Sequence, residues 1–96
     1  MYQIYVVFNC FEGKREAFVE RLKAEGILGA IRAEDGCEKY DFYFSEDDEN
    51  KILLVEAWTS RRHQEVHMTT EHMARFRVLK GSYVQSSVLK EYKTVD

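Results

Sequence analysis

The chain has 96 residues and a formal net charge of -3 at pH 7, and 45% of its residues are hydrophobic, including six Tyr, six Phe and one Trp. Its lysines and arginines are scattered and form no basic stripe, which argues against nucleic acid as a partner. No apolar run is long enough to cross a bilayer, and no basic segment precedes an apolar one at the N-terminus, so we expect a cytoplasmic protein without a membrane span or signal peptide.

This composition favours a single domain over residues 1–96 that shares apolar surface with a second copy of itself. A short chain buries a smaller fraction of its surface than a long one, so a subunit interface would add stability. An excess of aromatic residues is typical of interfaces and of ligand pockets. We therefore expect a homodimer with a pocket. Cys10 and Cys37 lack metal-ligand spacing and are expected to be free thiols.

The first predicted element is a strand over residues 2–9, with one face formed by Tyr2, Ile4, Val6 and Phe8. Its other face is also largely apolar, as expected for a central strand covered on both sides. Residues 13–34 then show helical spacing. Gly26 and Gly29 weaken that helix by up to ~1 kcal/mol each relative to Ala, so we expect a kink or a close packing contact there.

Two further strands are predicted on either side of an acidic turn. Residues 37–44 form the first and place on one face Tyr40, Phe42 and Phe44. The acidic run over residues 46–50 lacks the spacing of an EF-hand, so it is interpreted as a solvated turn and not as a calcium site. Residues 51–58 form the next strand and place on one face Ile52, Leu54, Glu56 and Trp58.

The last third of the chain predicts two helices and a strand. Thr59 or Ser60 can cap a helix that reaches about Met68, and Thr69-Thr70 offers a second cap before a helix over residues 71–79. The expected core stripe of these helices is Val66, Met73 and Phe76. Gly81 is predicted to end the second helix, and residues 83–93 to form a strand. The resulting order β-α-β-β-α-β predicts an α+β, ferredoxin-like fold with an antiparallel sheet.

Glu56 and Trp58 are two residues apart on one strand, so their side chains share a face. In a part-buried site beside the indole, burial would raise the pKa of the Glu56 carboxyl group. Alternatively, Glu56 pairs with a basic group across the sheet while Trp58 fills the core. The sequence leaves both interpretations open.

The histidines give one candidate for proton transfer. His63 and His67 have the spacing of a metal-binding pair on a helix, but Glu65 does not fit a zinc protease motif and no third ligand is evident, so no metal site is expected. His67 follows the Ser60 cap by nearly two helical turns. Its imidazole has an ordinary pKa near ~6.5 and could accept a proton at neutral pH.

Three segments together resemble the antibiotic biosynthesis monooxygenase family: Glu34-Asp35-Gly36-Cys37-Glu38-Lys39-Tyr40, Glu56-Ala57-Trp58-Thr59-Ser60, and His67 seven residues after Ser60. The resemblance implies a dimeric α+β barrel in which two sheets face each other and each subunit keeps a pocket between sheet and helices. For members such as the quinol monooxygenases, it implies oxygenation of a small aromatic molecule by molecular oxygen without metal, flavin or haem.

Within this resemblance His67 is the expected catalytic base, and the expected substrate-binding residues are Asn9, Tyr40, Glu56, Trp58 and His72. His72 is offset by five residues from His67 and is expected to turn partly away.

Other branches of the family imply other functions. A haem-degrading branch has a Trp and an axial His where this chain has His67 and Arg77, so haem is not expected even though Asn9 matches. A branch that isomerises a phosphorylated autoinducer sugar would need a phosphate-binding group, for which the candidates are Arg32, Arg61 and Arg62. That isomerase activity and a non-catalytic, small-molecule-binding role stay open as alternatives.

Overall fold

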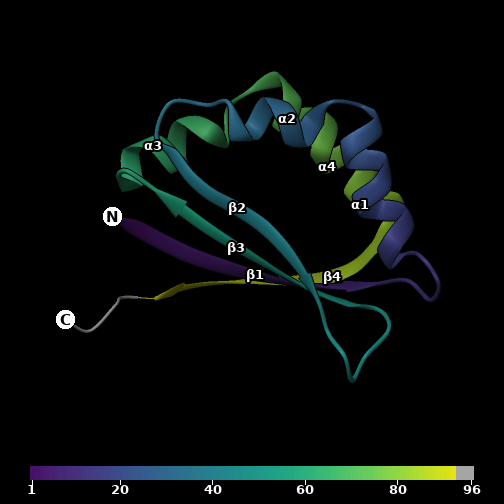
Figure 1. Ribbon diagram of the computed structural model, residues 1–96. Coiled ribbons are helices and arrows are strands. Elements are labelled where there is room, and N and C mark those ends of the chain that lie inside the picture. The colour runs from purple at the N-terminus through teal and green to yellow at the C-terminus, as the bar shows by residue number, and fades with distance from the viewer. Residues whose placement is uncertain (93–96) are drawn as a thin grey trace.

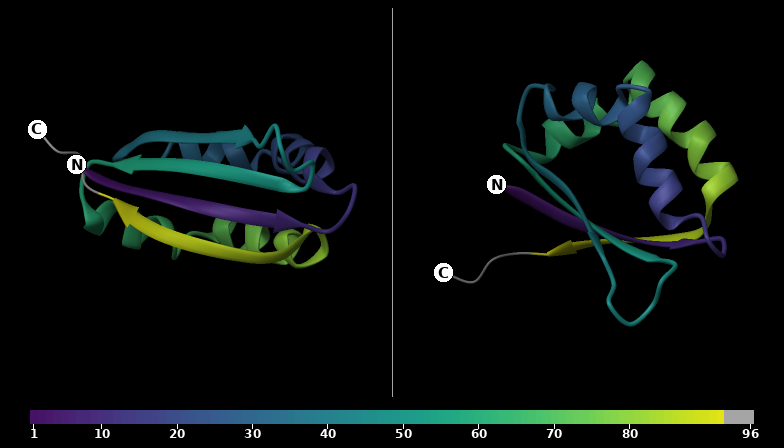
Figure 2. Two further views of the ribbon diagram at one scale, coloured as in Figure 1. Left: turned by 90° about the horizontal axis from the view of Figure 1, so that it is seen from below. Right: turned by 45° about the vertical axis from the view of Figure 1, so that its right-hand side comes forward.

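The computed structural model describes residues 1–92, which form a four-stranded antiparallel sheet with helices over one face (Figure 1). The elements are β1 (Tyr2–Cys10), α1 (Arg15–Ala24), α2 (Ile27–Arg32), β2 (Cys37–Phe44), β3 (Lys51–Trp58), α3 (Arg61–His67), α4 (Glu71–Tyr83) and β4 (Val84–Tyr92). The strand order is β2-β3-β1-β4, and the left view of Figure 2 shows the sheet from the side away from these helices. The predicted α+β, ferredoxin-like fold is confirmed.

The predicted strand faces are correct because the side chains of a strand alternate between the two sides of a sheet. β1 is central and pairs with β3 so that Ile4 lies opposite Glu56 and Val6 opposite Leu54. All four of these side chains are buried on the face that the helices cover. The core continues through the helices with Phe18, Leu22, Ile27, Leu28, Ile31, Met73 and Phe76.

The helical pattern of residues 13–34 forms two helices and not one. α1 ends at Ala24, and α2 begins after Gly26, whose φ of +74° lies in the left-handed region. A glycine adopts this conformation without the steric cost that a side chain would carry, and it commonly ends a helix. The expected kink is therefore a break, located at Gly26 and not at Gly29.

Both predicted caps of the later helices are present. The Ser60 hydroxyl accepts a hydrogen bond from the backbone N–H of His63 (3.3 Å), and the Thr70 hydroxyl accepts one from Met73 (3.4 Å). The prediction that Gly81 ends the second helix is wrong, because α4 continues to Tyr83. A glycine inside a helix costs only ~1 kcal/mol, and packing of α4 against α1 and α2 outweighs that. No helix of the described chain is long and apolar enough to cross a membrane.

The expected core stripe of α3 and α4 is partly wrong. Met73 and Phe76 are buried, but the Val66 side chain is 48% exposed. The chain leaves the α-helix between His67 and Glu71, and this interruption shifts the helical phase. As a result, the inward-facing residue at the end of α3 is His67 and not Val66.

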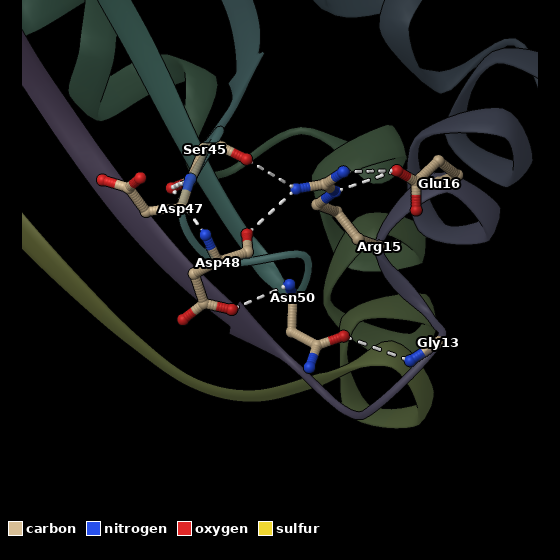
Figure 3. A network of polar contacts seen from close by, with 7 residues as sticks. All are labelled: Gly13, Arg15, Glu16, Ser45, Asp47, Asp48 and Asn50. Atoms are coloured by element: carbon tan, nitrogen blue, oxygen red, sulfur yellow. Dashed lines mark hydrogen bonds and ion pairs between the residues drawn. The ribbon is translucent and has the colours of Figure 1, made fainter.

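The acidic turn between β2 and β3 is tied to the start of α1 (Figure 3). The Arg15 guanidinium donates to the backbone carbonyls of Ser45 (3.1 Å) and Asp48 (3.0 Å), and the Asn50 side chain accepts from the backbone N–H of Gly13 (3.1 Å). The acidic side chains of the turn are exposed, as predicted. Two of its carbonyl oxygens are used by an arginine, which further disfavours calcium binding.

Candidate functional site

A cavity of about 250 Å³ lies between the helix-covered face of the sheet and the helices α3 and α4. The strands contribute Val6, Phe8, Tyr40, Leu54, Glu56, Ser87 and Leu89, and the helical segments contribute Gln64, His67, Met68, Met73, Phe76, Arg77 and Lys80. Most of these side chains are apolar, with a few polar groups at defined places. This is the usual composition of a site for a small organic molecule.

His67 forms one wall of the cavity although its side chain is only 1% exposed to solvent. Its ring lies 4.5 Å from the Trp58 ring and 5.7 Å from the Tyr40 ring, measured between centroids. Its Nδ1 atom is 2.8 Å from Oε2 of Glu34. A carboxylate only accepts hydrogen bonds, so Nδ1 carries the proton and Nε2 keeps its lone pair for a molecule in the cavity.

Burial lowers the pKa of His67, because the protonated ring would lose its hydration, while the hydrogen bond to Glu34 opposes that shift. The direction of the net shift favours a neutral imidazole near pH 7. A neutral imidazole with a fixed tautomer is the form that can accept a proton from a bound molecule.

Glu34 is the member of this group that sequence reasoning missed. It is only 12% exposed, and its Oε2 atom lies 2.7 Å from Nε2 of His72 as well as 2.8 Å from Nδ1 of His67. The structure thus brings His72 to the site through Glu34, although His72 does not line the cavity. Glu34 begins the segment that carries the family resemblance, and that was the available signal for it.

The turn after α2 carries Glu34 to α3. Gly36, with φ of +82°, allows the tight turn, and a Cβ atom built there would lie 2.3 Å from Cδ2 of His63. The close approach of this turn to α3 therefore requires glycine. On the helix side, the Thr70 hydroxyl donates to the backbone carbonyl of His67 (2.9 Å), which holds the junction of α3 and α4 in place.

Glu34, His67 and His72 are also the one group in the described residues whose ligand atoms could surround a metal ion, since these atoms lie within 4.8 Å of one another. Both rings donate a proton to Glu34 in the observed arrangement, so a metal would have to displace those protons. His63, which the helical spacing had paired with His67, bonds to Ser60 and Asp35 instead. The expectation that no metal is bound stays a prediction.

One interpretation of the sequence paired Glu56 with a basic group across the sheet, and the structure shows a different environment. The Trp58 indole N–H donates to Oε1 of Glu56 (3.0 Å), and no basic group within residues 1–92 forms an ion pair with this carboxyl. Glu56 is 4% exposed and faces the cavity. Burial raises its pKa to about 7, and the indole N–H only partly offsets that shift. Trp58 is fully buried behind Glu56 and His67 and does not line the cavity.

Asn9 lies elsewhere. It follows Phe8 in β1, so its side chain is on the sheet face opposite the cavity, where its amide donates to the Ser86 hydroxyl (3.2 Å). The structure therefore does not bring Asn9 to His67 within one chain. Of the expected site residues, those that line the cavity are Tyr40, Glu56 and His67.

Two cations lie on the α4 side of the cavity. Arg77 donates to the backbone carbonyl of Met68 (3.3 Å), and its charge helps to lower the pKa of His67. Lys80 places its ammonium 5.6 Å from the centroid of the Phe8 ring. Burial lowers the pKa of Lys80.

Comparisons with known proteins agree with this fold. Residues 1–79 match the sequence profile of the family described as "Antibiotic biosynthesis monooxygenase". The chain is 31% identical over 81 residues to the Bacillus subtilis protein named "Putative monooxygenase YcnE", a match that covers 84% of this chain and 82% of that protein.

Solved structures extend the similarity to the whole fold. The structure of Rv0793 from Mycobacterium tuberculosis has a TM-score of 0.83 and 26% identity, and the match covers 99% of this chain and 95% of that one. The Nitrosomonas europaea protein titled "Putative antibiotic biosynthesis monooxygenase" has a TM-score of 0.86 and 24% identity, with both chains covered completely.

Proposed function

This chain belongs to the antibiotic biosynthesis monooxygenase family, and from this premise we propose that it oxygenates a quinol or a related phenolic compound without metal, flavin or haem. The observation that carries the proposal is the imidazole of His67 at the wall of a largely apolar cavity, with its Nδ1 atom 2.8 Å from the Glu34 carboxyl. In this reaction His67 removes a phenolic proton through Nε2. Glu34 fixes the tautomer, and Tyr40 supplies an aromatic wall.

The chemistry needs no external reductant. The phenolate passes an electron to dioxygen, and the two radicals combine to form a carbon–oxygen bond. Loss of water then breaks the oxygen–oxygen bond. One hydroquinone and one dioxygen give one hydroxyquinone and one water, so the substrate supplies every electron. The protein has to bind the aromatic ring, accept a proton and exclude bulk water. The apolar lining of the cavity and the position of His67 support the first two of these requirements.

Purified protein that has been treated with a chelator should consume dioxygen when it is given a suitable member of a panel of hydroquinones. An oxygen electrode measures the consumption, and product analysis should give one hydroxyquinone for each dioxygen consumed. Uptake that disappears on chelation would contradict the cofactor-independent reaction. Binding of the whole panel without oxygen uptake would favour the alternative of a non-catalytic binding domain.

The isomerase of a phosphorylated sugar receives no support from the arginines considered for phosphate binding. Arg32 donates to the backbone carbonyl of Tyr40, and Arg61 and Arg62 pair with Glu65. None of these three arginines lines the cavity.

We also propose that the protein is a homodimer through the uncovered face of its sheet. Val7 is central on this face and lies opposite Leu53 of β3 and Val88 of β4. Leu53 and Val88 are 37% and 48% exposed, so an apolar row crosses three strands without a covering layer from the described helices. Two such faces packed together would form the barrel that the family resemblance implies.

Light scattering at micromolar concentration should therefore give about twice the chain mass of 11.4 kDa. Leu53→Glu should reduce the measured mass to that of one chain, because a carboxylate would be buried between the sheets without a partner. Val78→Glu is the matched control, since Val78 is 77% exposed on α4 and lies away from this face. A wild-type protein that is monomeric under these conditions would contradict the proposed interface.

A further inference from the structure

The cavity has two chemically different ends along the strands. At one end, Glu56 of β3 lies opposite Tyr40 of β2. Four residues earlier in β3, Ile52 lies opposite Phe8, which in turn lies opposite Ser87 of β4. Because a strand rises about 3.3 Å per residue, these two ends are about 13 Å apart. His67 belongs to the first end, since its ring contacts Tyr40.

Lys80 belongs to the second end, since its ammonium lies beside the Phe8 ring. Within residues 1–92 its side chain forms no ion pair and no hydrogen bond. Several other cations pair with a carboxylate, for example Arg15 and Arg21. A half-buried ammonium without an anion has lost hydration that the contact with the Phe8 ring replaces only in part, and a bound anion would compensate for that loss.

Besides the polar residues Gln64, Arg77 and Ser87, the cavity has an apolar wall. It consists of Val6, Leu54, Met73, Phe76 and Leu89. Such a wall suits the body of an aromatic molecule, whereas sugar hydroxyl groups placed against these apolar side chains would lack hydrogen-bond partners. The required ligand is thus elongated, with a proton-donating group at one end and an anion at the other.

We propose that the substrate is a phenolic carboxylate whose carboxylate binds Lys80 while its phenolic hydroxyl lies at His67. The position of the hydroxyl rests on the proposed function. The carboxylate site at Lys80 rests on the unpaired ammonium and on the shape and polarity of the cavity, and it would hold for a non-catalytic binding protein as well.

The test is calorimetric titration with 3,4-dihydroxycinnamate and with its neutral amide. Wild-type protein should bind the acid about 10- to 100-fold more tightly, as expected for one hydrogen bond between charged groups. Lys80→Met keeps the length of the side chain and removes its charge, so it should abolish this preference while leaving the affinity for the amide unchanged. Lys80→Arg should restore part of the preference. Lys14→Met is the control, because Lys14 is exposed and does not line the cavity.

Equal affinities for acid and amide in the wild type would overturn the proposal, as would a preference that survives in Lys80→Met or a failure to bind the acid at millimolar concentration. Tighter binding of ribose 5-phosphate than of the acid would overturn the aromatic assignment. Oxygen uptake is recorded separately. A Lys80-dependent preference without uptake would contradict the oxygenase function alone, and uptake without the preference would contradict the carboxylate site alone.

Discussion

As the pH rises from about 5 to about 8, the wild type should lose about 2–4 kcal/mol of unfolding free energy that the Glu56→Gln variant keeps. Burial raises the pKa of Glu56 from 4.5 to about 7 in the folded protein. The folded protein therefore holds this proton more tightly than the unfolded chain does. The stability that the protonated carboxyl contributes is complete below about pH 4.5 and is lost as the pH rises through about 7. Glutamine cannot ionise, so the variant does not lose this stability.

Glutamine is the suitable replacement because its side-chain oxygen can still accept the hydrogen bond from Trp58. His67 has the opposite pH dependence. Its pKa is lowered by burial, so its contribution is present above about pH 6.5 and is lost as the pH falls through the lower, folded-state value. Both proteins contain His67, so its contribution cancels when their free energies of unfolding are subtracted at each pH.

Urea unfolding at a fixed protein concentration, followed by the fluorescence of the single tryptophan, Trp58, gives the required free energies. Glu65→Gln is the matched control. Glu65 is 54% exposed on α3 and pairs with arginines at the surface, so its difference curve should be flat. A flat curve for Glu56→Gln would show that the Glu56 carboxyl is ionised in the folded protein at ordinary pH.

The strands of this fold were predictable in detail, and the helices less so. The bounds of β2 and β3 match the sequence prediction, because the two-residue alternation of a half-buried strand is short-range and continues up to the turn. The helical period is longer, and interruptions change its phase. With the break before α4, Val66 faces outward and His67 inward. No local sequence pattern predicts how far such a break rotates one helix relative to the next.

Two of the cavity residues could be predicted from strand alternation, and His67 was predicted from its helical position and the family resemblance. Glu56 and Tyr40 follow from alternation, and the same alternation places Asn9 on the face opposite Phe8. Asn9 was assigned to the pocket from the family resemblance, against its own strand pattern. Glu34 could not be placed by spacing, because it meets His67 across 33 residues of chain and depends on how the turn at Gly36 packs under α3.

The strongest effect on turnover is expected for His67→Asn. Loss of a positioned general base typically lowers the rate by ~10²–10⁴-fold. The asparagine amide can occupy the position of Nδ1 and still donate to Glu34, but it offers no basic nitrogen in place of Nε2. Alanine would be a poorer test, since His67 is 1% exposed and its removal would also leave a cavity and an unpaired Glu34.

Turnover per folded molecule and the melting temperature have to be measured on the same His67→Asn preparation. If His67 is the base, the rate falls by the range above while the protein stays folded, because a loss of about 1–2 kcal/mol from imperfect packing is small beside a typical folding free energy. His63→Asn is the control, since His63 bonds to Ser60 and does not line the cavity, and its turnover should match the wild type. A His67→Asn protein that melts earlier but oxygenates a hydroquinone at the wild-type rate per folded molecule would make His67 a structural residue. The proton acceptor would then be Glu56, which also lines the cavity and whose pKa burial raises to about 7.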